Sequence, residues 1–557
     1  MGFWNTGAAA ACALVLSGCA TGATDEAATV FRDVSVLTMT SETVLEHQSI
    51  IVRDGLIAAI GPTATTPSPA GARVIDGAGR YVMPGLVDAH AHPTAQSELI
   101  SYALYGVTSL FTLGGEGIND ARPAPGLFAP NVLSSGTTFD STPPINRRFL
   151  SLARPEDAGA LIDQQLARGA AFVKVYTFLD QPRLCAIYRE AHARNIAVVG
   201  HIPRALSADE ALACLDMVAH GEEFFRYMGR PPTPEGIAAM ADAAARHGVF
   251  VTPNISAYAG MYRHVTTLDQ ELADPEAAFL SPPTYQEVQP QNNRYASRPN
   301  RDQFRANTVQ GMTTLKAFTA ALHARGVPLL AGTDAPIMCF PGRCLLQDLD
   351  LLREAGLSHY EILRTATSNA GRFVTERMHR NERIGVVEVG ARADLIMLSA
   401  NPLESLDALE DVRGVMIAGV YRTRAEIVGE REALRPAIAR AHAQVDEYER
   451  LLAAGDMAAL TRFIDAQPVD VMFLNMNVVI FDALTLEQEG KRVEALALLT
   501  SALRHLPRAH GMWNELGRMR AEGGDVVGAR AAYQSVLAFE PLNGVAQAGL
   551  AALTPPP

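Results

Sequence analysis

The feature that most constrains the fold is a series of short apolar segments between residues 83 and 375. They lack the polar alternation of a half-exposed strand, and most are followed by a helical pattern. After a first strand that ends at His90, they read VTSLFTL, NVLSSG, AFVKVY, AVVGH, DMVAH, VFVTP and PLLAGTD. Such strands, alternating with helices, are typical of a parallel sheet buried on both faces. Eight units predict an α/β protein with a (β/α)₈ TIM barrel over residues 83–375, whose chemistry lies at the carboxyl ends of the strands.

Strand patterns flank this barrel on both sides. Residues 28–82 contain short alternating segments, and Asp54-Gly55 separates two apolar runs, which is a strong hairpin signal. Similar segments, ADLIMLS and GVMIAGVYR, return within residues 376–430. We expect the two flanks to form one composite β-sandwich domain.

The remainder of the chain predicts helices. Residues 431–465 read as a charged, Ala-rich linking helix, and 466–557 carry a 34-residue period in which Ala495 and Ala529, and Pro507 and Pro541, recur. The positions of Trp513, Leu516, Gly517, Ala529, Tyr533 and Pro541 resemble a tetratricopeptide repeat. The resemblance implies a TPR-like domain at 466–557 that docks a protein partner or a second copy of the chain. A purely stabilising helical appendage remains the alternative.

Composition excludes some classes of function. The 557 residues carry a formal net charge of −13, whereas proteins that bind nucleic acid concentrate Lys and Arg to displace counterions. We therefore expect no nucleic-acid partner. No apolar run reaches the roughly 18 to 20 residues that a membrane-spanning helix requires, so the mature protein is not expected to be transmembrane.

The first residues resemble an export signal. An apolar stretch over residues 7–16 is followed by Leu16-Ser17-Gly18-Cys19, which resembles the lipobox of bacterial lipoproteins. The resemblance implies that residues 1–19 include a signal peptide and that Cys19 is lipidated. The first basic residue is Arg32, which departs from the usual signal, and an ordinary secretory signal or a buried helix remains open. We expect an exported protein, periplasmic or anchored in the outer membrane, which touches the membrane through its lipid only.

Four further cysteines then lie in a compartment that permits disulfides: Cys185, Cys214, Cys339 and Cys344. Pro341-Gly342 favours a tight turn between the last two, so we expect a bond between Cys339 and Cys344. Two unrelated thiols are the alternative.

Five of the predicted barrel strands finish in a residue whose side chain is able to bind or bridge a metal. His90 and His92 alternate along the first strand and so point to one side. A lysine flanked by valines in a dry barrel needs a partner, a modification or a catalytic role. The full set is His90, His92, Lys174, His201, His220 and Asp334. Because the eighth strand of a closed barrel neighbours the first, Asp334 can reach the two histidines of the first strand.

These residues, together with PGLVDAHAH, GTDAP, TATSNAG and VGARADLIML, resemble the amidohydrolase superfamily, in its imidazolonepropionase-like and metal-dependent prolidase-like branch. The resemblance covers roughly residues 28 to 430. It implies that His90, His92 and Asp334 bind one metal and that His201 and His220 bind a second. It also implies that Lys174, as a carboxylated side chain, bridges the two. This ligand set suits Zn²⁺, with Mn²⁺, Co²⁺ or Fe²⁺ possible.

The implied chemistry is hydrolysis of an amide or peptide bond by a metal-activated hydroxide, as in a dipeptidase or prolidase. Two metals lower the pKa of a bound water to about 7. Asp334 is expected to accept its proton and return it to the leaving amine. The alternatives are hydrolysis of a cyclic amide, lactone or ester, deamination at a one-metal site, and an inactive barrel whose repeats bind a partner at the membrane.

Residues that bind substrate are expected just beyond the strand ends. Tyr176 and Arg204 follow Lys174 and His201, and Tyr258 follows the seventh strand. A hydroxyl or guanidinium there could hold an oxyanion or a carboxylate. Glu222 and Glu223 could orient ligands. The polar segment 261–307 is predicted to be a long loop that forms a lid.

Overall fold

The computed structural model describes residues 28–114, 123–146, 148–468 and 473–553. The proposed lipidation residue, Cys19, lies outside these residues, as does the whole predicted signal at 1–19. Among the residues described, no helix combines the length and apolar character needed to cross a membrane.

Parallel strands form the predicted barrel. Seven of the eight appear as regular strands: β6 (Leu86–Ala91), β7 (Val107–Thr112), β8 (Asn131–Ser134), β11 (Val173–Val175), β12 (Val198–Gly200), β13 (Met217–Val218) and β14 (Phe250–Val251). Residues 328–335 take the eighth place, because Leu329 bridges Val251 and Ala335 bridges Ala91, both in parallel. The side of the barrel between β8 and β11 is joined by a hydrogen bond from the Ala171 N–H to the Ser134 carbonyl.

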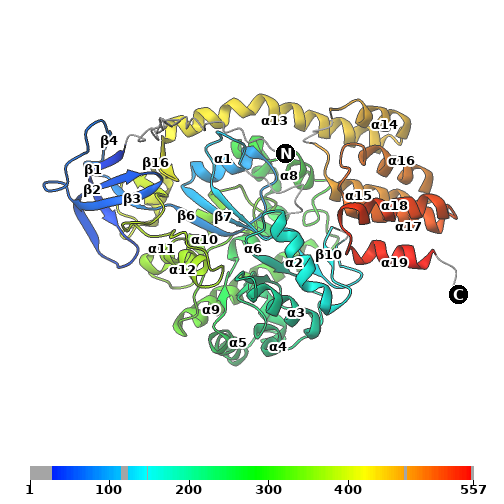
Figure 1. Ribbon diagram of the computed structural model, residues 1–557, viewed down its shortest axis with the longest axis horizontal. Helices are drawn as coiled ribbons and strands as arrows, with labels where there is room; N and C mark the ends of the chain where they lie inside the picture. The colour runs from blue at the N-terminus through cyan, green and yellow to red at the C-terminus, as the bar shows by residue number, and fades with distance from the viewer. Residues whose placement is uncertain (1–27, 115–122, 147, 469–472, 554–557) are drawn as a thin grey trace, which may run out of the picture.

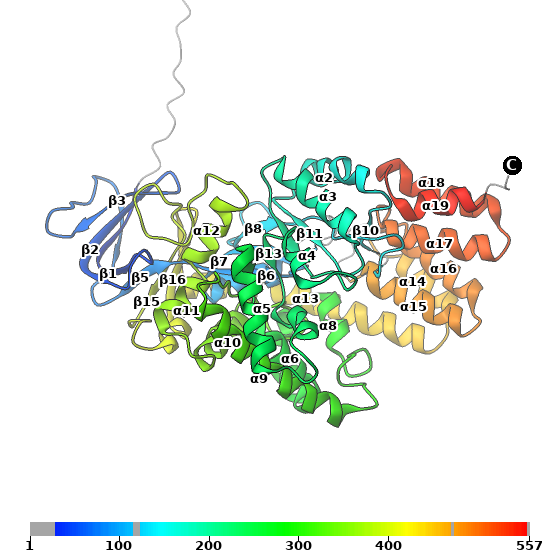
Figure 2. The same ribbon diagram turned by 90° about the horizontal axis from the view of Figure 1, so that it is seen from below.

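Helices surround these strands (Figures 1 and 2). Those packed around the barrel are α1 (Gln96–Leu104), α2 (Ala158–Ala167), α3 (Gln181–His192), α4 (Ala208–Leu212), α5 (Pro234–His247), α6 (Ile255–Thr266), α9 (Arg301–Ala324), α10 (Arg343–Glu354), α11 (His359–Thr365) and α12 (Ser368–Glu376). Short elements add to them: η1 (Pro155–Asp157), η2 (Gly221–Tyr227), β9 (Phe139–Asp140) and β10 (Leu150–Ser151).

One end of the barrel is closed by packed aromatic rings. Phe111 lies 6.2 Å from Phe172 and 5.9 Å from Phe373, and Phe373 lies 5.0 Å from Phe250, measured between ring centroids. Phe373 belongs to α12, which therefore plugs this end. The buried rings exclude water here, so only the carboxyl ends of the strands leave room for a site.

The two flanks share one sheet, although not as a sandwich of two separate sheets. Its strands are β1 (Thr29–Leu37), β2 (Val44–Arg53), β3 (Leu56–Pro62), β4 (Arg73–Asp76), β5 (Tyr81–Pro84), β15 (Leu395–Leu398), β16 (Val412–Ile417) and β17 (Val420–Thr423). All eight are hydrogen-bonded in one sheet, in the order β17-β16-β15-β5-β1-β2-β3 with β4 beside β1. The β2–β3 hairpin turns at Asp54 and Gly55, which both have positive φ, as an Asp-Gly turn requires.

The segment predicted as a long loop is instead mostly helical. After α6 it contains α7 (Leu268–Ala273), η3 (Pro275–Phe279) and α8 (Pro282–Val288), and α9 begins at Arg301. Proline at the start of η3 and α8 is compatible with the first turn of a helix, where its missing N–H is no loss. The many prolines thus mark helix starts and not only loops.

The C-terminal region is helical throughout its described part. The predicted linking helix is two helices, α13 (Arg424–Ala453) and α14 (Met457–Asp465), and is followed by α15 (Met476–Gln488), α16 (Arg492–Ala502), α17 (His510–Glu522), α18 (Val526–Phe539) and α19 (Gly544–Ala552). A short helix, η4 (Leu406–Glu410), precedes β16. In Figure 1, α13 runs along the barrel and connects the β domain at one end of the molecule to the helices at the other.

Candidate metal centre

Three side chains converge at the open end of the barrel. The Nε2 atoms of His90 and His92 lie 3.3 Å and 2.9 Å from Oδ1 of Asp334, and 3.1 Å from each other. Ligand atoms of all three lie within 4.8 Å of one another, which is the spacing of groups that could hold one metal ion. His90 and His92 leave β6 on the same side, as predicted for alternate residues of a strand.

A buried aspartate holds the first and eighth strands in register. Oδ1 of Asp88 accepts hydrogen bonds from the backbone N–H groups of His90 and Thr333, and Oδ2 accepts from the Thr333 hydroxyl at 2.6 Å. Gly332 permits the close approach of the two strands, since a Cβ at this position would lie 3.0 Å from the backbone nitrogen of His90. Asp334 follows with φ +58°, a left-handed conformation that turns the chain at the strand end.

Three more of the predicted ligands border the same cavity. The ring of His220 lies 4.5 Å from that of His90 and 4.6 Å from that of His201. Lys174 is buried, and its Nζ lies 3.4 Å from the Leu113 carbonyl oxygen. The six predicted ligands, which come from five strands, therefore lie together at the open end of the barrel.

Neighbouring groups fix how the histidines present their nitrogens. Nδ1 of His90 lies 3.0 Å from the Ala219 carbonyl, which can only accept, so Nδ1 carries the proton and Nε2 is left with a lone pair. Nδ1 of His201 lies 2.6 Å from a carboxylate oxygen of Glu223, with the same consequence. Glu223 thus contacts a predicted ligand, as expected for both glutamates, and Oε1 of Glu222 lies 3.4 Å from Nδ1 of His220.

His220 is held by a residue that the sequence analysis missed. Nδ1 of His220 lies 2.9 Å from the side-chain amide of Asn254, which is buried and has φ +58°. A non-glycine residue in this conformation is uncommon and marks a constrained position. Asn254 follows the seventh strand, and its signal in the sequence is only an asparagine after VTP.

Electrostatics favour the protonation states that bind metal. Burial lowers the pKa of all four histidines, most strongly for His90 and His220, so they are neutral at pH 7. Burial alone would raise the pKa of Asp334, but His90 and His92 hold it well below its usual range. Burial lowers the pKa of Lys174 to about 8, which raises the fraction of its neutral amine, although the ammonium form still predominates at pH 7.

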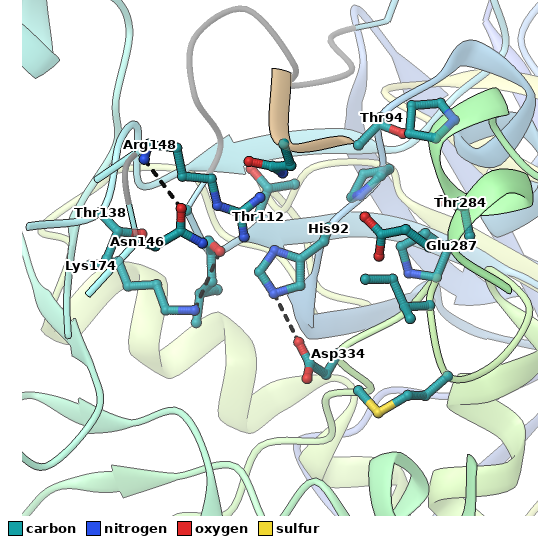
Figure 3. A pocket seen from close by; sticks show the side chains of 18 of the residues that line it. His92, Thr94, Thr112, Thr138, Asn146, Arg148, Lys174, Thr284, Glu287 and Asp334 are labelled. Carbon is teal, nitrogen blue, oxygen red and sulfur yellow. Dashed lines mark hydrogen bonds and ion pairs between the residues drawn. The ribbon is translucent and has the colours of Figure 1, made fainter. Parts of the chain in front are cut away.

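A cavity of about 290 Å³ opens above these residues. Figure 3 shows Asn146, Arg148 and Lys174 on one side of His92, Thr284 and Glu287 on the other, and Asp334 below it. The polar segment between α6 and α9 contributes Pro283, Thr284, Glu287 and Arg294 to the wall. Its predicted position over the site is therefore correct, although its predicted loop structure is not.

Of the three predicted substrate residues, Tyr176 lines this cavity, with its ring 4.1 Å from that of His201. Arg204 and Tyr258 are not among the described residues that line it. Arg204 is exposed, with its guanidinium carbon 5.9 Å from the ring centre of Phe178. Tyr258 lies on α6, where its ring packs against Gly311 of α9.

The structure also records two disulfides. Cys339 is bonded to Cys344, with 5.5 Å between their Cα atoms, in the segment that follows the eighth strand. Cys185 of α3 is bonded to Cys214, which lies between α4 and β13. The second pair was not expected, since residues 29 positions apart give no local signal of contact.

The donor set fits a divalent metal. Neutral imidazoles and a carboxylate are ligands of Zn²⁺ and of similar ions, and His90 and His201 are oriented by acceptors behind them, as metal ligands usually are. His90, His92 and Asp334 would hold one ion, and His201, His220 and Lys174 line the cavity beside them.

Part of the chain is similar to a known family. Residues 179–421 match the sequence model of the Amidohydrolase family. An 86-residue segment is 38% identical to an adenine deaminase of Rubrobacter xylanophilus, and covers 15% of this chain and 14% of that protein. A 260-residue segment is 25% identical to the imidazolonepropionase of Acidiphilium cryptum. This alignment covers 36% of this chain and 64% of that protein. The chain thus aligns with less than two thirds of either relative.

A solved structure supports the fold. A Bifidobacterium longum structure assigned as a prolidase superposes with a TM-score of 0.54 and 23% identity, and the alignment covers 73% of this chain and all of that one. At this identity the likeness concerns the fold only.

Proposed function

The chain carries an amidohydrolase-family segment at residues 179–421, and we propose that it is a metal-dependent hydrolase that cleaves the amide or peptide bond of a small substrate. One observation carries the proposal. His90, His92 and Asp334 bring their ligand atoms within 4.8 Å of one another, in a cavity that His201, His220 and Lys174 also line or border. A divalent metal, when bound, would polarise the scissile carbonyl and make water acidic enough to react near neutral pH.

The residues of the chain supply the proton transfers. Asp334 lines the cavity as an ionised carboxylate, so it can accept the proton of the attacking water. The same group, once protonated, can donate to the departing amine, because a carbon–nitrogen bond breaks readily only when the nitrogen leaves protonated. Tyr176 lines the cavity with a hydroxyl whose pKa burial raises, so it stays protonated and can donate to an oxyanion.

We further propose that Lys174 carries a carbamate and helps to hold a second metal. Its neutral amine would form a nitrogen–carbon bond to carbon dioxide and release one proton, giving an anionic oxygen ligand. Two observations support this proposal. Lys174 is buried, and no carboxylate among the described residues is in hydrogen-bond contact with its amine. Lys174 also lines the same cavity as His201.

The size and polarity of the cavity support a small, peptide-like substrate. About 290 Å³ is at the low end for ligand pockets, and the walls bear several charged and amide side chains. A dipeptide or an N-acyl amino acid fits these features. The prolidase assignment of the structural neighbour agrees with this choice, while the deaminase relative makes release of ammonia from a heterocycle the second candidate.

A mixed library tests the proposal. Purified protein, loaded with Zn²⁺ or Mn²⁺, is incubated with dipeptides, N-acyl amino acids, cyclic amides, lactones and amino-heterocycles, and the products are identified by mass spectrometry. We expect an acid and an amine from one or more linear amides, and no product after the metal has been chelated. Ammonia from a heterocycle as the only product would support deamination and contradict the proposal.

We also propose that the chain is exported and anchored by a lipid on Cys19, and that the helices after residue 466 form a TPR-like unit. The LSGC sequence supports the first proposal. The packing of Gly517 in α17 against Tyr533 in α18 supports the second, because a Cβ on this glycine would lie 2.7 Å from the ring.

A further inference from the structure

The C-terminal helical region contributes directly to the wall of the catalytic cavity. Asn475 and Asn477, at the start of α15, line the same cavity as His92, Tyr176 and Asp334. In Figure 3 the pale orange ribbon that enters above His92, opposite Asp334, is this part of the chain. A region that the sequence separates from the barrel thus takes part in the site.

Asn475 is positioned to bind a ligand. It is the N-cap of α15, and its Oδ1 accepts a hydrogen bond from the backbone N–H of Asn477 at 2.7 Å. Asn475 is only 6% exposed, yet its Nδ2 has no hydrogen-bond partner among the described residues. This nitrogen carries two N–H donors at the wall of the cavity, so an acceptor on a molecule bound in the cavity would satisfy them.

The surrounding charges favour an anionic acceptor. Arg148 and Arg294 line the same cavity, and the N-terminus of the 13-residue helix α15 adds a partial positive charge. Glu287 is the opposing charge from α8, and Asp334 already lies against His92 and His90. A carboxylate can accept a hydrogen bond from the amide and is attracted by the positive charge of the two guanidinium groups.

Contacts on both sides hold this wall against the barrel. Nε2 of His510, at the start of α17, donates to the carbonyl oxygen of Arg148. A guanidinium nitrogen of Arg168, which follows α2 of the barrel, lies 3.2 Å from Oε1 of Glu540. On the other side the hydroxyl of Tyr285, in α8, donates to Asp446 of α13. The helices therefore fix both the loop that bears Arg148 and the helix that bears Glu287.

We propose that Asn475 is a substrate-binding residue, whose Nδ2 donates to the C-terminal carboxylate of a peptide-like substrate, with Arg148 and Arg294 supplying the balancing charge. The appended helical region thereby makes the enzyme selective for substrates with a free carboxylate. This inference rests on the proposed hydrolase function and adds the specificity of its cavity.

Two variants separate substrate binding from helix capping. Asn475→Asp keeps an oxygen that caps α15 but replaces the N–H donor with a second, negatively charged oxygen. Asn475→Ser keeps a cap and removes the donor without adding charge. The reverse exchange at another N-cap, Asp525→Asn of α18, is the matched control, because Asp525 is not among the described residues that line the cavity.

The assay compares each active library substrate with its C-terminal carboxamide. We expect Asn475→Asp to raise KM for the carboxylate form about 10-fold or more, Asn475→Ser to raise it less, and kcat to stay within about twofold, because the contact is made equally before and during reaction. KM for the carboxamide form should rise by less than about twofold in both variants, and Asp525→Asn should match the wild type on both forms. Equal changes on the two forms, or none, would overturn the inference while leaving the hydrolase function intact.

A binding measurement covers the case in which wild-type protein hydrolyses no library member and the proposed function fails. Calorimetry of the metal-loaded protein with N-acetylproline and with its carboxamide then reports on the subsite without turnover. Preference for the carboxylate in the wild type, lost in Asn475→Asp, supports the inference. Equal binding of the two ligands by both proteins, or binding of neither, overturns it.

Discussion

Asp334 combines position and charge in the way that a general base requires. It follows the eighth strand, lies against both histidines of the first strand and remains ionised because those neighbours hold its pKa below the usual range. Its left-handed conformation directs the chain away immediately afterwards, which leaves the carboxylate at the cavity wall. No serine or cysteine nucleophile is needed in such a site.

Replacing this carboxylate by an amide should abolish most of the reaction. Asn has the shape of Asp but cannot accept the proton, so we expect Asp334→Asn to lower kcat by about 10²- to 10⁴-fold while the far-ultraviolet circular dichroism is unchanged. Asp302→Asn, at a fully exposed position of α9, is the control and should keep wild-type kcat. A kcat for Asp334→Asn within about twofold of the wild type would remove Asp334 as the base.

The ligand residues were predictable from the sequence because strand alternation and barrel closure constrain them. Those two rules bring His90, His92 and Asp334 close together, and the family resemblance gives them their expected role as metal ligands. Asn254 and Asn475 were not predictable, since each acts through a loop or helix end whose path depends on tertiary packing. Asp88 belongs to a recognisable motif, but its role in joining two strands is visible only in the hydrogen bonds of the fold.

At the scale of elements, disulfides stabilise two connections around the barrel. The Cys339–Cys344 bond closes a short loop beside the site, whereas the Cys185–Cys214 bond joins α3 to the segment before β13. The sequence predicted the first pair from its turn residues. It could not predict the second, or the helices α7 and α8, because proline-rich polar segments form helices when their ends are capped and packed.

The longer loop should matter more for stability. In the chain-entropy view, a disulfide that spans 29 residues stabilises by about 1.5 kcal/mol more than one that spans 5. We expect Cys185→Ser/Cys214→Ser to lower the denaturation midpoint more than Cys339→Ser/Cys344→Ser, which should affect turnover more than stability.

Two measurements check this. Denaturant unfolding compares the midpoints of the two double variants. A larger drop in midpoint for Cys339→Ser/Cys344→Ser than for Cys185→Ser/Cys214→Ser would contradict the predicted order. Mass spectrometry of alkylated, unreduced native protein gives the redox state, and alkyl label on all four cysteines would exclude both bonds and the proposed oxidising compartment.

At the scale of the whole molecule, α13 attaches the C-terminal helices to the barrel. Arg431 of α13 forms a buried ion pair with Glu276 of η3 at 2.6 Å, and His442 donates to the carbonyl oxygen of Leu280. The general architecture of barrel, flanking sheet and helical tail was predictable from periodicity. The docking of the tail over the open end of the barrel was not, because isolated helix patterns carry no information about which surface they cover.

Breaking this ion pair should weaken the attachment. Arg431→Ala removes the ion-pair partner of the half-buried Glu276, so we expect a loss of about 1 to 3 kcal/mol in the free energy of unfolding. Replacing both residues, Arg431→Met with Glu276→Leu, should restore most of it. Arg450→Ala, which breaks an exposed pair within α13, should cost less than about 1 kcal/mol. Equal effects of Arg431→Ala and Arg450→Ala in denaturant unfolding would show that the buried pair does not anchor the region.

The central claim is that six side chains form one metal-dependent hydrolytic centre. Its most direct test is a titration of metal-free protein with Zn²⁺, in which bound metal and hydrolysis of the best library substrate are followed together, with Lys174→Ala beside the wild type. We predict no hydrolysis without metal, activity that saturates at about two ions per chain, and only one tightly bound ion in Lys174→Ala. Undiminished hydrolysis by the metal-free protein, or saturation of the wild type at one ion, would contradict the account.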